Sequence, residues 1–263
     1  MTRLFVSRRR FMGIAGVAAS TVPLAGCDML DGLLAGDDPV RGFLASANTL
    51  TYRLQRLLIP VDRLAPEFSE SEIRQGQRPN GSTDPTDPAY LALKDAEFAA
   101  YRLNVSGLVE RPMQLTLDEL RNMPSRTQIT RHDCVEGWSC VAKWTGVPLA
   151  RVLDEAGVKS DARYVVFHCF DSMSLGLGGS AAYYESIDMI DARHPQTILA
   201  HGLNGTLLPV ANGAPLRVRI ERQLGYKMAK YIRAIEVVSD LSKIGGGRGG
   251  YWEDLGYDWY AGI

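Results

Sequence analysis

The strongest constraint on the fold is a series of short segments in which apolar and polar residues alternate or β-branched residues gather. Alternation places successive side chains on opposite faces of an extended chain, so each segment predicts a β-strand. Short helices are predicted between them, at 117–123 and 148–156, without the regular spacing of βαβ units. We therefore predict an α+β fold of mixed strands and short helices. The predicted strands are 101–105, 127–131, 163–170, 216–220 and 232–238.

Composition places the chain among ordinary globular proteins. Hydrophobic residues make up 46% and charged residues 22% of the 263 residues, which excludes a disordered, collagen-like or coiled-coil protein. The chain carries 29 Lys and Arg against 30 Asp and Glu. This balance argues against a nucleic-acid partner, because such proteins show a basic face.

The first 26 residues predict a targeting segment. Ser7–Met12 reads SRRRFM, and an apolar run from Gly13 to Ala25 follows it. A basic start before a short apolar run is typical of a signal peptide, and paired arginines followed by Phe11 resemble the twin-arginine export signal. That pathway carries folded proteins, many of them already loaded with a cofactor. The alternative is a basic first turn that leads into a core helix.

The apolar run ends at a possible lipid attachment site. Leu24-Ala25-Gly26-Cys27 resembles the lipobox of bacterial lipoproteins, in which the cysteine becomes the lipidated first residue. Two or three acyl chains, at about 0.8 kcal/mol per buried CH₂, hold a protein stably on a membrane. Asp28 resembles a signal for retention in the inner membrane. We therefore expect a protein anchored through Cys27 to the periplasmic side of the inner membrane.

Four regions are predicted along the chain. Before the core, leucines at helical spacing in 48–59 predict a helix that Pro60 ends, and proline-rich residues 60–89 predict a long loop. The regions are a signal peptide (1–26), a tether with helix and loop (27–95), a core of mixed strands and short helices (96–240) and a Gly-rich aromatic tail (241–263).

The stretch most informative about chemistry is Arg131–Cys140, with the sequence RHDCVEGWSC, which follows directly on a predicted strand. Three interpretations of Cys134 are open from the residues alone. A zinc site would need further ligands at closer spacing. A disulfide between Cys134 and Cys140 would close a small loop. A single Cys134 thiolate would suit a soft, redox-active metal.

This stretch, continued by Trp144 and Gly146-Val147-Pro148-Leu149, resembles the molybdenum-binding loop of the sulfite oxidase superfamily. The closer likeness is to its periplasmic molybdopterin-dependent branch, which includes the protein-methionine-sulfoxide reductases. Asn212–Arg217 (NGAPLR) resembles the family's Asn-Gly-Ala-Pro-x-Arg, and Gly225–Lys230 (GYKMAK) its Gly-Phe-Lys-x-x-Lys. The likeness covers roughly residues 80–240.

The resemblance implies a sulfite-oxidase-type fold, a molybdenum ion held by Cys134, and a molybdopterin cofactor. It places Glu136 beside the metal as a catalytic residue. A molybdopterin phosphate needs cations, and Arg217, Arg222, Lys227 and Lys230 are close in sequence, although a solvated basic edge is the alternative. Cys169 stands where the family has a hydroxyl residue near the cofactor, and the alternative is a buried core cysteine. Asn80-Gly81 fall where the family's N-terminal loop touches the cofactor, and a simple turn is equally consistent with these two residues. The cofactor-binding residues implied are Asn80, Gly81, Cys169, Asn212, Arg217, Met228, Ala229 and Lys230.

The implied reaction is oxygen-atom transfer with an S-oxide or N-oxide. Sulfite dehydrogenation is the alternative, but sulfite oxidases have an arginine shortly after the ligand cysteine, where this chain has Val135, Glu136 and Gly137. Arg131, His132 and His168 are other sources of positive charge. A lipoprotein that binds the cofactor without turnover is a third possibility, which the presence of Cys134 opposes.

Partners follow from the same resemblance. The sequence has no C-x-x-C-H haem attachment motif, so we expect a separate electron-transfer subunit, a membrane haem protein. Only 25 residues follow Val238, too few for the dimerisation domain of sulfite oxidases. We therefore expect a monomer without that domain.

Overall fold

A computed structural model describes residues 39–174 and 180–263 of the chain. The expected signal peptide and Cys27 lie outside the described residues. The chain divides into two compact units, Met1–Thr49 and Leu50–Ile263, and the second contains every strand described below. Among the described residues, no helix is both long enough and apolar enough to cross a membrane.

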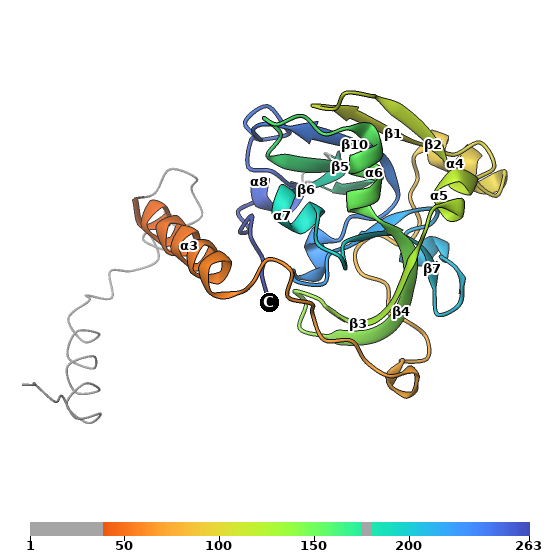
Figure 1. The fold of residues 1–263 in the computed structure, drawn as a ribbon, viewed down its shortest axis with the longest axis horizontal. Coiled ribbons are helices and arrows are strands. Elements are labelled where there is room, and N and C mark those ends of the chain that lie inside the picture. Colours follow the sequence, from red (N-terminus) through yellow and green to blue (C-terminus); the bar gives the residue numbers. More distant parts are fainter. Residues whose placement is uncertain (1–38, 175–179) are drawn as a thin grey trace, which may run out of the picture. The chain divides into compact units, whose positions relative to one another are not determined.

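The first of two sheets has five strands in the order β2-β1-β10-β5-β6. Only β1 and β10 run parallel, and the other neighbours are antiparallel, so the sheet is mixed. The labels β1, β2, β5, β6 and β10 lie together in Figure 1. The strands are β1 (Arg102–Gly107), β2 (Met113–Thr116), β5 (Tyr164–Ser174), β6 (Ser180–Asp188) and β10 (Ile232–Val238).

The second sheet carries the informative stretch of the sequence. Its order is β3-β4-β7-β8, with β9 paired to β7, and all of its pairs are antiparallel. The side chains of β4 alternate in burial, which places Cys140, Ala142 and Trp144 inside. The strands are β3 (Arg126–Asp133), β4 (Ser139–Pro148), β7 (Ile198–Leu203), β8 (Thr206–Leu207) and β9 (Arg217–Arg219).

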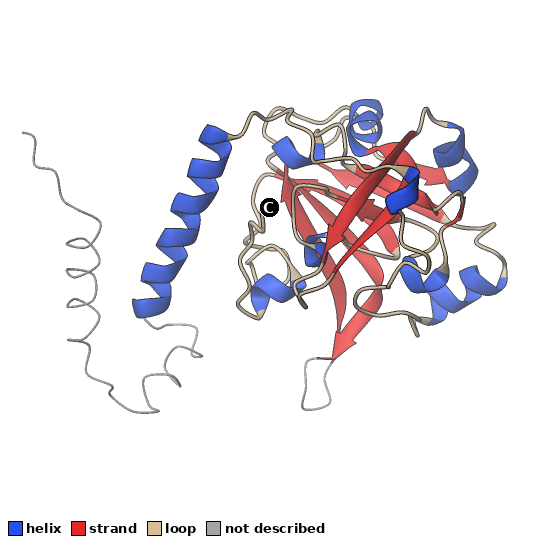
Figure 2. Cartoon of the chain, turned by 90° about the horizontal axis from the view of Figure 1, so that it is seen from below, coloured by secondary structure: helices blue, strands red, loops and turns tan. Residues whose placement is uncertain are grey.

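Helices are short apart from α3, and Figure 2 shows them around the strands. Local signals explain several boundaries. Thr116 and Glu119 form a capping box at the start of α5, Asp87 caps α4, and Gly157 ends α6 in the left-handed conformation. The helices are α3 (Pro39–Leu58), α4 (Pro88–Asp95), α5 (Leu117–Asn122), α6 (Leu149–Ala156), α7 (Met189–Ala192) and α8 (Tyr251–Asp254), with short 3₁₀ turns η1 (Glu70–Glu72), η2 (Val210–Asn212) and η3 (Gly225–Lys227).

The main hydrophobic core joins the two sheets. It combines Phe167 and Ile235 of the first sheet with Leu199 and Val218 of the second, and the buried face of α6 packs into it. This arrangement confirms the predicted α+β class. The five predicted strands are present, but β2, β4, β6, β7 and β8 were not predicted, and α3 begins at Pro39 rather than at residue 48. Proline is favoured in the first turn of a helix, and small residues such as alanine extend one readily.

Candidate active site

Cys134 begins the loop 134–138 that joins β3 to β4. The Cys134 backbone N–H donates to the Trp138 carbonyl at 2.9 Å, and the Gly137 N–H donates back to the Cys134 carbonyl at 3.0 Å. These two bonds close a tight turn at the end of a long antiparallel pair (Figure 1). A rigid hairpin therefore presents the thiol at its tip.

The tip of the hairpin contributes to a cavity where segments far apart in the sequence meet. Cys134, Val135 and Glu136 come from the hairpin, Met228 and Lys230 from the segment after η3, and Asn80 from the long loop before α4. The tail supplies aromatic rings. The complete lining is Asn80, Gly81, Ser82, Cys134, Val135, Glu136, Asp171, Met173, Tyr183, Tyr226, Met228, Lys230, Trp252 and Tyr257.

The cysteines distinguish among the three interpretations of the motif. Cys134, Cys140 and Cys169 are all free thiols, so the disulfide alternative is wrong. Within residues 39–174 and 180–263, no three His, Cys, Asp or Glu side chains gather as a zinc site would need. Burial raises the pKa of the Cys134 thiol, and the Glu136 carboxylate adds to that rise. A metal ligand must be a thiolate, so metal binding here would release the proton.

Gly225 brings the second motif against the hairpin. A Cβ atom on Gly225 would lie 2.4 Å from His132 Nε2 and 3.3 Å from the Asp133 carbonyl. No side chain fits there, so only glycine allows η3 to approach the end of β3. This approach places Met228 and Lys230 on the cavity, whereas Ala229 belongs to the hydrophobic core.

Two cations of the predicted set are buried at this place. Burial, reinforced by the charge of Arg217, lowers the pKa of Lys230 to about 7, and burial together with Arg219 lowers that of Arg217 to about 9. Within the described residues, both donate only to carbonyl and amide oxygens: Lys230 to Ser82 and Ala211, and Arg217 to Asn80, Asn212 and Met228. The buried Nε of Arg217 has no acceptor among the described residues. Buried cations held by neutral oxygens form a site for an anion.

Gly213 makes room for this pair of cations. Its φ is +113°, and a Cβ atom there would lie 3.0 Å from Lys230 Cβ and 3.2 Å from Arg217 Cβ. The preceding residue, Asn212, is buried, and its carbonyl accepts from Arg217 Nη1 at 2.9 Å. The side chain of Asn212 reaches the Gln77 carbonyl at 3.5 Å and does not line the cavity.

The loop residues Asn80 and Gly81, which the resemblance assigned to the cofactor, line the cavity. Asn80 Nδ2 donates to the Gly225 carbonyl at 3.4 Å, and its Oδ1 accepts from Arg217 Nη2 at 3.3 Å. The next residue, Ser82, donates from Oγ to Asp171 Oδ2 at 2.6 Å, and its carbonyl accepts from Lys230. The loop before α4 therefore lines the cavity and also accepts hydrogen bonds from both Arg217 and Lys230.

Asp171 is the site residue that the sequence reasoning missed. It lies on β5, is 4% exposed, and its Oδ1 has no hydrogen-bond partner among the described residues. Burial raises the pKa of Asp171, while the Ser82 hydrogen bond and the charge of Lys230 oppose the rise. The available signal was an acid directly after the apolar run 163–170, because burying a carboxylate is costly without a function or a partner.

Other predicted residues lie elsewhere. Cys169 is 2% exposed in the hydrophobic core and does not line the cavity, so its side chain packs as a core cysteine. Lys227 is buried between Glu185 and Glu253, and Arg222 pairs with Asp191. The prediction of four clustered cations was therefore wrong, because Arg222 and Lys227 form ion pairs with carboxylates.

The remaining candidate positive charges are also engaged. Arg131 pairs with Asp133, and His168 Nε2 lies 2.8 Å from Glu236. His132 accepts at Nδ1 from Arg219 at 2.8 Å, since a guanidinium only donates. Burial and Arg219 lower the pKa of His132 well below its ordinary value, so it is neutral. Glu136 is exposed at the cavity, where it accepts from Trp138 Nε1 at 2.9 Å and lies 3.9 Å from Arg78 Nη2.

Comparison with known proteins agrees with this geometry. A family model described as the oxidoreductase molybdopterin binding domain matches residues 90–243. A protein of Azospira oryzae, named a protein-methionine-sulfoxide reductase subunit, is 37% identical over 97% of this chain and 88% of its own. The protein-methionine-sulfoxide reductase catalytic subunit of Xanthomonas campestris pv. campestris is 38% identical over 66% of this chain. The chain spans about half of that subunit, 53% of its length.

A solved structure also resembles the chain. The sulfane dehydrogenase SoxCD of Paracoccus pantotrophus matches 58% of this chain and 45% of its own, with a TM-score of 0.48 and 22% identity. The family match extends over most of the core and includes Cys134, Arg217 and Lys230. The chain therefore belongs to the molybdopterin-binding oxidoreductases of the sulfite oxidase superfamily and is a molybdenum-dependent enzyme with a molybdopterin cofactor.

Proposed function

We propose that this enzyme reduces S-oxides, with methionine sulfoxide as the leading substrate. The observation that carries the proposal is the lining of the Cys134 cavity. Glu136 places a carboxylate there, beside methionine and aromatic side chains. Carboxylates repel an anion such as sulfite, whereas thioethers and aromatic rings favour a neutral sulfur compound. The names of the Azospira and Xanthomonas relatives support the same substrate class.

The residues present fit the cofactor. Lys230 and Arg217 are buried cations that lack a carboxylate partner within the described residues, which suits the molybdopterin phosphate. Asn80 and the backbone of Met228–Lys230 lie beside them. Cys134 supplies the one thiol of the cavity as a ligand to the metal. Molybdenum, when bound, supplies the two-electron oxygen-atom chemistry.

The reaction also needs protons, and Asp171 is positioned to supply them. Reducing a sulfoxide to a sulfide takes two electrons and two protons and releases water. Asp171 lies in the cavity, Ser82 holds one of its oxygens, and the other oxygen is unpartnered among the described residues. We infer that Asp171 donates a proton to the departing oxygen and regains it from solvent.

Asp171→Asn is expected to lower kcat by roughly 100-fold, the usual contribution of a general acid. Burial raises the pKa of Asp171, so the wild-type rate should fall as pH rises through that raised value, and the variant should lose this dependence. The measurement is the pH profile of kcat with methionine sulfoxide and reduced viologen. Molybdenum and pterin content should not change.

Asp84→Asn is the matched control, because Asp84 is an exposed acid in the loop before α4, two residues after Ser82, and is paired with Lys94 at 2.9 Å. It should leave the pH profile unchanged. The same assay, extended to N-oxides and to sulfite oxidation, tests the substrate. Sulfite turnover faster than sulfoxide reduction would overturn the proposed function.

We further propose that the enzyme works at the periplasmic face of the inner membrane, anchored through Cys27, as a monomer. Its electrons would come one at a time from a separate membrane haem subunit. Supporting this are the twin-arginine sequence, the lipobox, and a relative named as a reductase subunit.

Arg8→Lys combined with Arg9→Lys is expected to leave the protein in the cytoplasm, because charge is kept and only specific recognition of arginine is lost. Cell fractionation with immunoblotting measures the outcome. Cys27→Ala is the companion variant, which should abolish labelling by a radioactive fatty acid. Continued export of the double lysine variant would contradict the twin-arginine assignment.

A further inference from the structure

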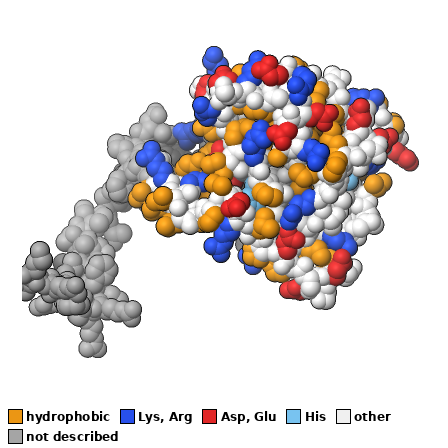
Figure 3. All heavy atoms as spheres, in the orientation of Figure 1, with side chains coloured by type: hydrophobic (Ala, Val, Ile, Leu, Met, Phe, Trp, Pro, Cys, Tyr) orange, Lys and Arg blue, Asp and Glu red, His pale blue; other side chains and the backbone are white. Residues whose placement is uncertain are grey.

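The outer face of α3 is apolar and exposed. Leu50, Leu54, Leu57 and Leu58 recur at the spacing of one helix face, and Leu57 is 80% and Leu58 74% exposed. Val61 and Leu64, which follow the helix in the chain, are also exposed, at 57% and 48%. We call these six residues the leucine face. Figure 3 shows hydrophobic side chains gathered on this segment. Contiguous exposed apolar surface of this kind marks an interaction site.

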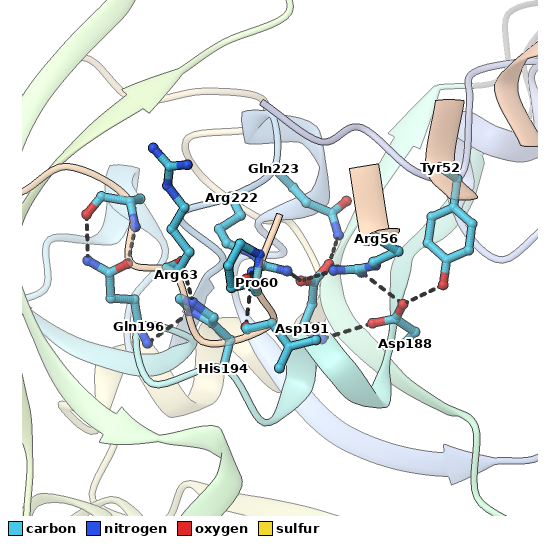
Figure 4. A network of polar contacts seen from close by, with 12 residues as sticks. Tyr52, Arg56, Pro60, Arg63, Asp188, Asp191, His194, Gln196, Arg222 and Gln223 are labelled. Carbon is cyan, nitrogen blue, oxygen red and sulfur yellow. Dashed lines mark hydrogen bonds and ion pairs between the residues drawn. The ribbon is translucent and has the colours of Figure 1, made fainter. Parts of the chain in front are cut away.

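The opposite face of α3 holds the helix to the body of the same unit. Arg56 Nη2 lies 2.8 Å from both Asp188 and Asp191, and Tyr52 donates to Asp188 at 2.9 Å (Figure 4). Arg222 binds the same Asp191 at 3.0 Å. A surface helix normally buries its apolar face and exposes its polar face. Here the polar face is clamped and the leucine face is left outward, in a fixed orientation.

Charge and the neighbouring cavity indicate what covers this face. Apart from Arg56, which Asp188 and Asp191 neutralise, the charged residues between Leu50 and Leu64 are Arg53, Asp62 and Arg63, so this segment keeps a net positive charge. Ile59, Leu64 and Ile263 line a cavity of about 370 Å³, whose charged lining consists of the arginines Arg63, Arg131 and Arg222 and the carboxylates Asp133 and Glu221. This cavity contains no cysteine and is separate from the Cys134 site. Apolar side chains beside arginines suit the boundary between acyl chains and phosphate headgroups.

We propose that the leucine face lies in the interface of an anionic phospholipid bilayer and sets the orientation of the enzyme on the membrane. The proposal deepens the membrane location proposed above. Residues 28–38 separate Cys27 from α3, and fully extended they span at most about 40 Å. A lipid on Cys27 would therefore hold α3 close to the bilayer, where even a weak interfacial contact becomes populated.

The test uses vesicles and cofactor-loaded protein without the lipid. Residues 28–263 contain the whole compact unit from Leu50 onward and omit the lipidated cysteine, so binding reports the protein surface alone. Two vesicle compositions are used, phosphatidylcholine alone and phosphatidylcholine mixed with the anionic phosphatidylglycerol, and this protein should float with the anionic vesicles. Leu57→Gln with Leu58→Gln should lower the partition coefficient by roughly tenfold or more. Arg53→Gln should lower it by roughly fivefold, and only on the anionic vesicles.

A matched control is Leu207→Gln with Leu255→Gln, two leucines that are 67% and 52% exposed outside the leucine face. This control should bind like the wild type. Molybdenum content and sulfoxide turnover in solution should be unchanged in both double variants, so failure of the membrane proposal is distinguishable from failure of the enzymatic one.

Three results would overturn the proposal. In the first case, the wild-type protein would stay unbound on both vesicle compositions. In the second case, binding would require a membrane electron-transfer subunit in the vesicles, which would make the face a protein interface. In the third case, sedimentation would show self-association lost in the Leu57→Gln/Leu58→Gln variant, which would assign the face to a second copy of this chain.

Discussion

Cys134→Ser is expected to remove sulfoxide reduction almost completely. Mutating a residue that only hydrogen-bonds to a metal ligand already lowers activity or metal affinity by about 10–100-fold. Loss of the protein ligand itself should therefore lower kcat by more than roughly 100-fold. The reason is that a serine hydroxyl ionises far less readily than a thiol and is a poorer ligand for a soft metal. The measurement is kcat with reduced viologen, together with the electron paramagnetic resonance signal of Mo(V).

Cys140→Ser is the matched control for this prediction. Cys140 is buried on β4 and does not line the cavity, so its hydroxyl variant should lose stability of about 1–3 kcal/mol but retain turnover per molybdenum. Equal loss of activity in both variants, at equal metal content, would contradict the assignment of Cys134 as the ligand. Normal turnover by Cys134→Ser would contradict it as well.

The second large effect is expected from Lys230→Met, which removes a buried cation but keeps a similar length. Purified variant should contain less molybdopterin than the wild type, because a partly desolvated ion pair at about 4 Å contributes on the order of 4 kcal/mol at an effective dielectric of 20. Lys230→Glu should retain still less, since its carboxylate would repel the phosphate. Pterin fluorescence after oxidation of the released cofactor measures the content.

Lys230→Met should also stabilise the folded, cofactor-free chain at low pH. Burial lowers the pKa of Lys230 to about 7 in the folded chain, against about 10.4 for an unperturbed lysine in the unfolded chain. Lys230 therefore keeps its proton to a higher pH in the unfolded chain than in the folded chain. The free energy by which Lys230 destabilises the folded chain is largest below about pH 7 and disappears as pH rises towards about 10.4. At pH 6, Lys230→Met should raise the free energy of unfolding by at most on the order of 4 kcal/mol.

Chemical denaturation of the cofactor-free proteins at pH 6 and at pH 9.5 measures this difference. Lys94→Met is the control, because Lys94 is a surface lysine paired with the exposed Asp84. It should change neither cofactor content nor the pH dependence of stability. A Lys230→Met variant that keeps full pterin content would show that Lys230 does not hold the cofactor.

Much of the candidate site was predictable because its motifs are local. The run from Cys134 to Ser139 comprises the turn of the hairpin and the first residue of β4, so the candidate metal ligand could be identified from contiguous residues. Gly225 was part of a recognisable motif. It must be glycine because any side chain at this position would clash with His132. Strands such as β10 were predicted because alternation depends only on neighbours in the chain.

Other features depend on which distant segments meet, and no local pattern contains that information. Arg217, Arg222, Lys227 and Lys230 look equivalent in sequence. Their surroundings separate them: carboxylates on β6, α7 and α8 pair with Lys227 and Arg222, while Arg217 and Lys230 face neutral oxygens.

The sequence by itself therefore determined the class of fold and, through the resemblance of its motifs, the cofactor family and Cys134 as the candidate ligand, because these rest on residues close together in the chain. The tertiary structure alone decided that Asp171 enters the cavity, that Cys169 stays in the core, and that α3 turns its leucines outward. The physical reason is burial. The free energy of a charge or an apolar side chain depends on the groups packed around it, and those groups come from residues far away in the sequence.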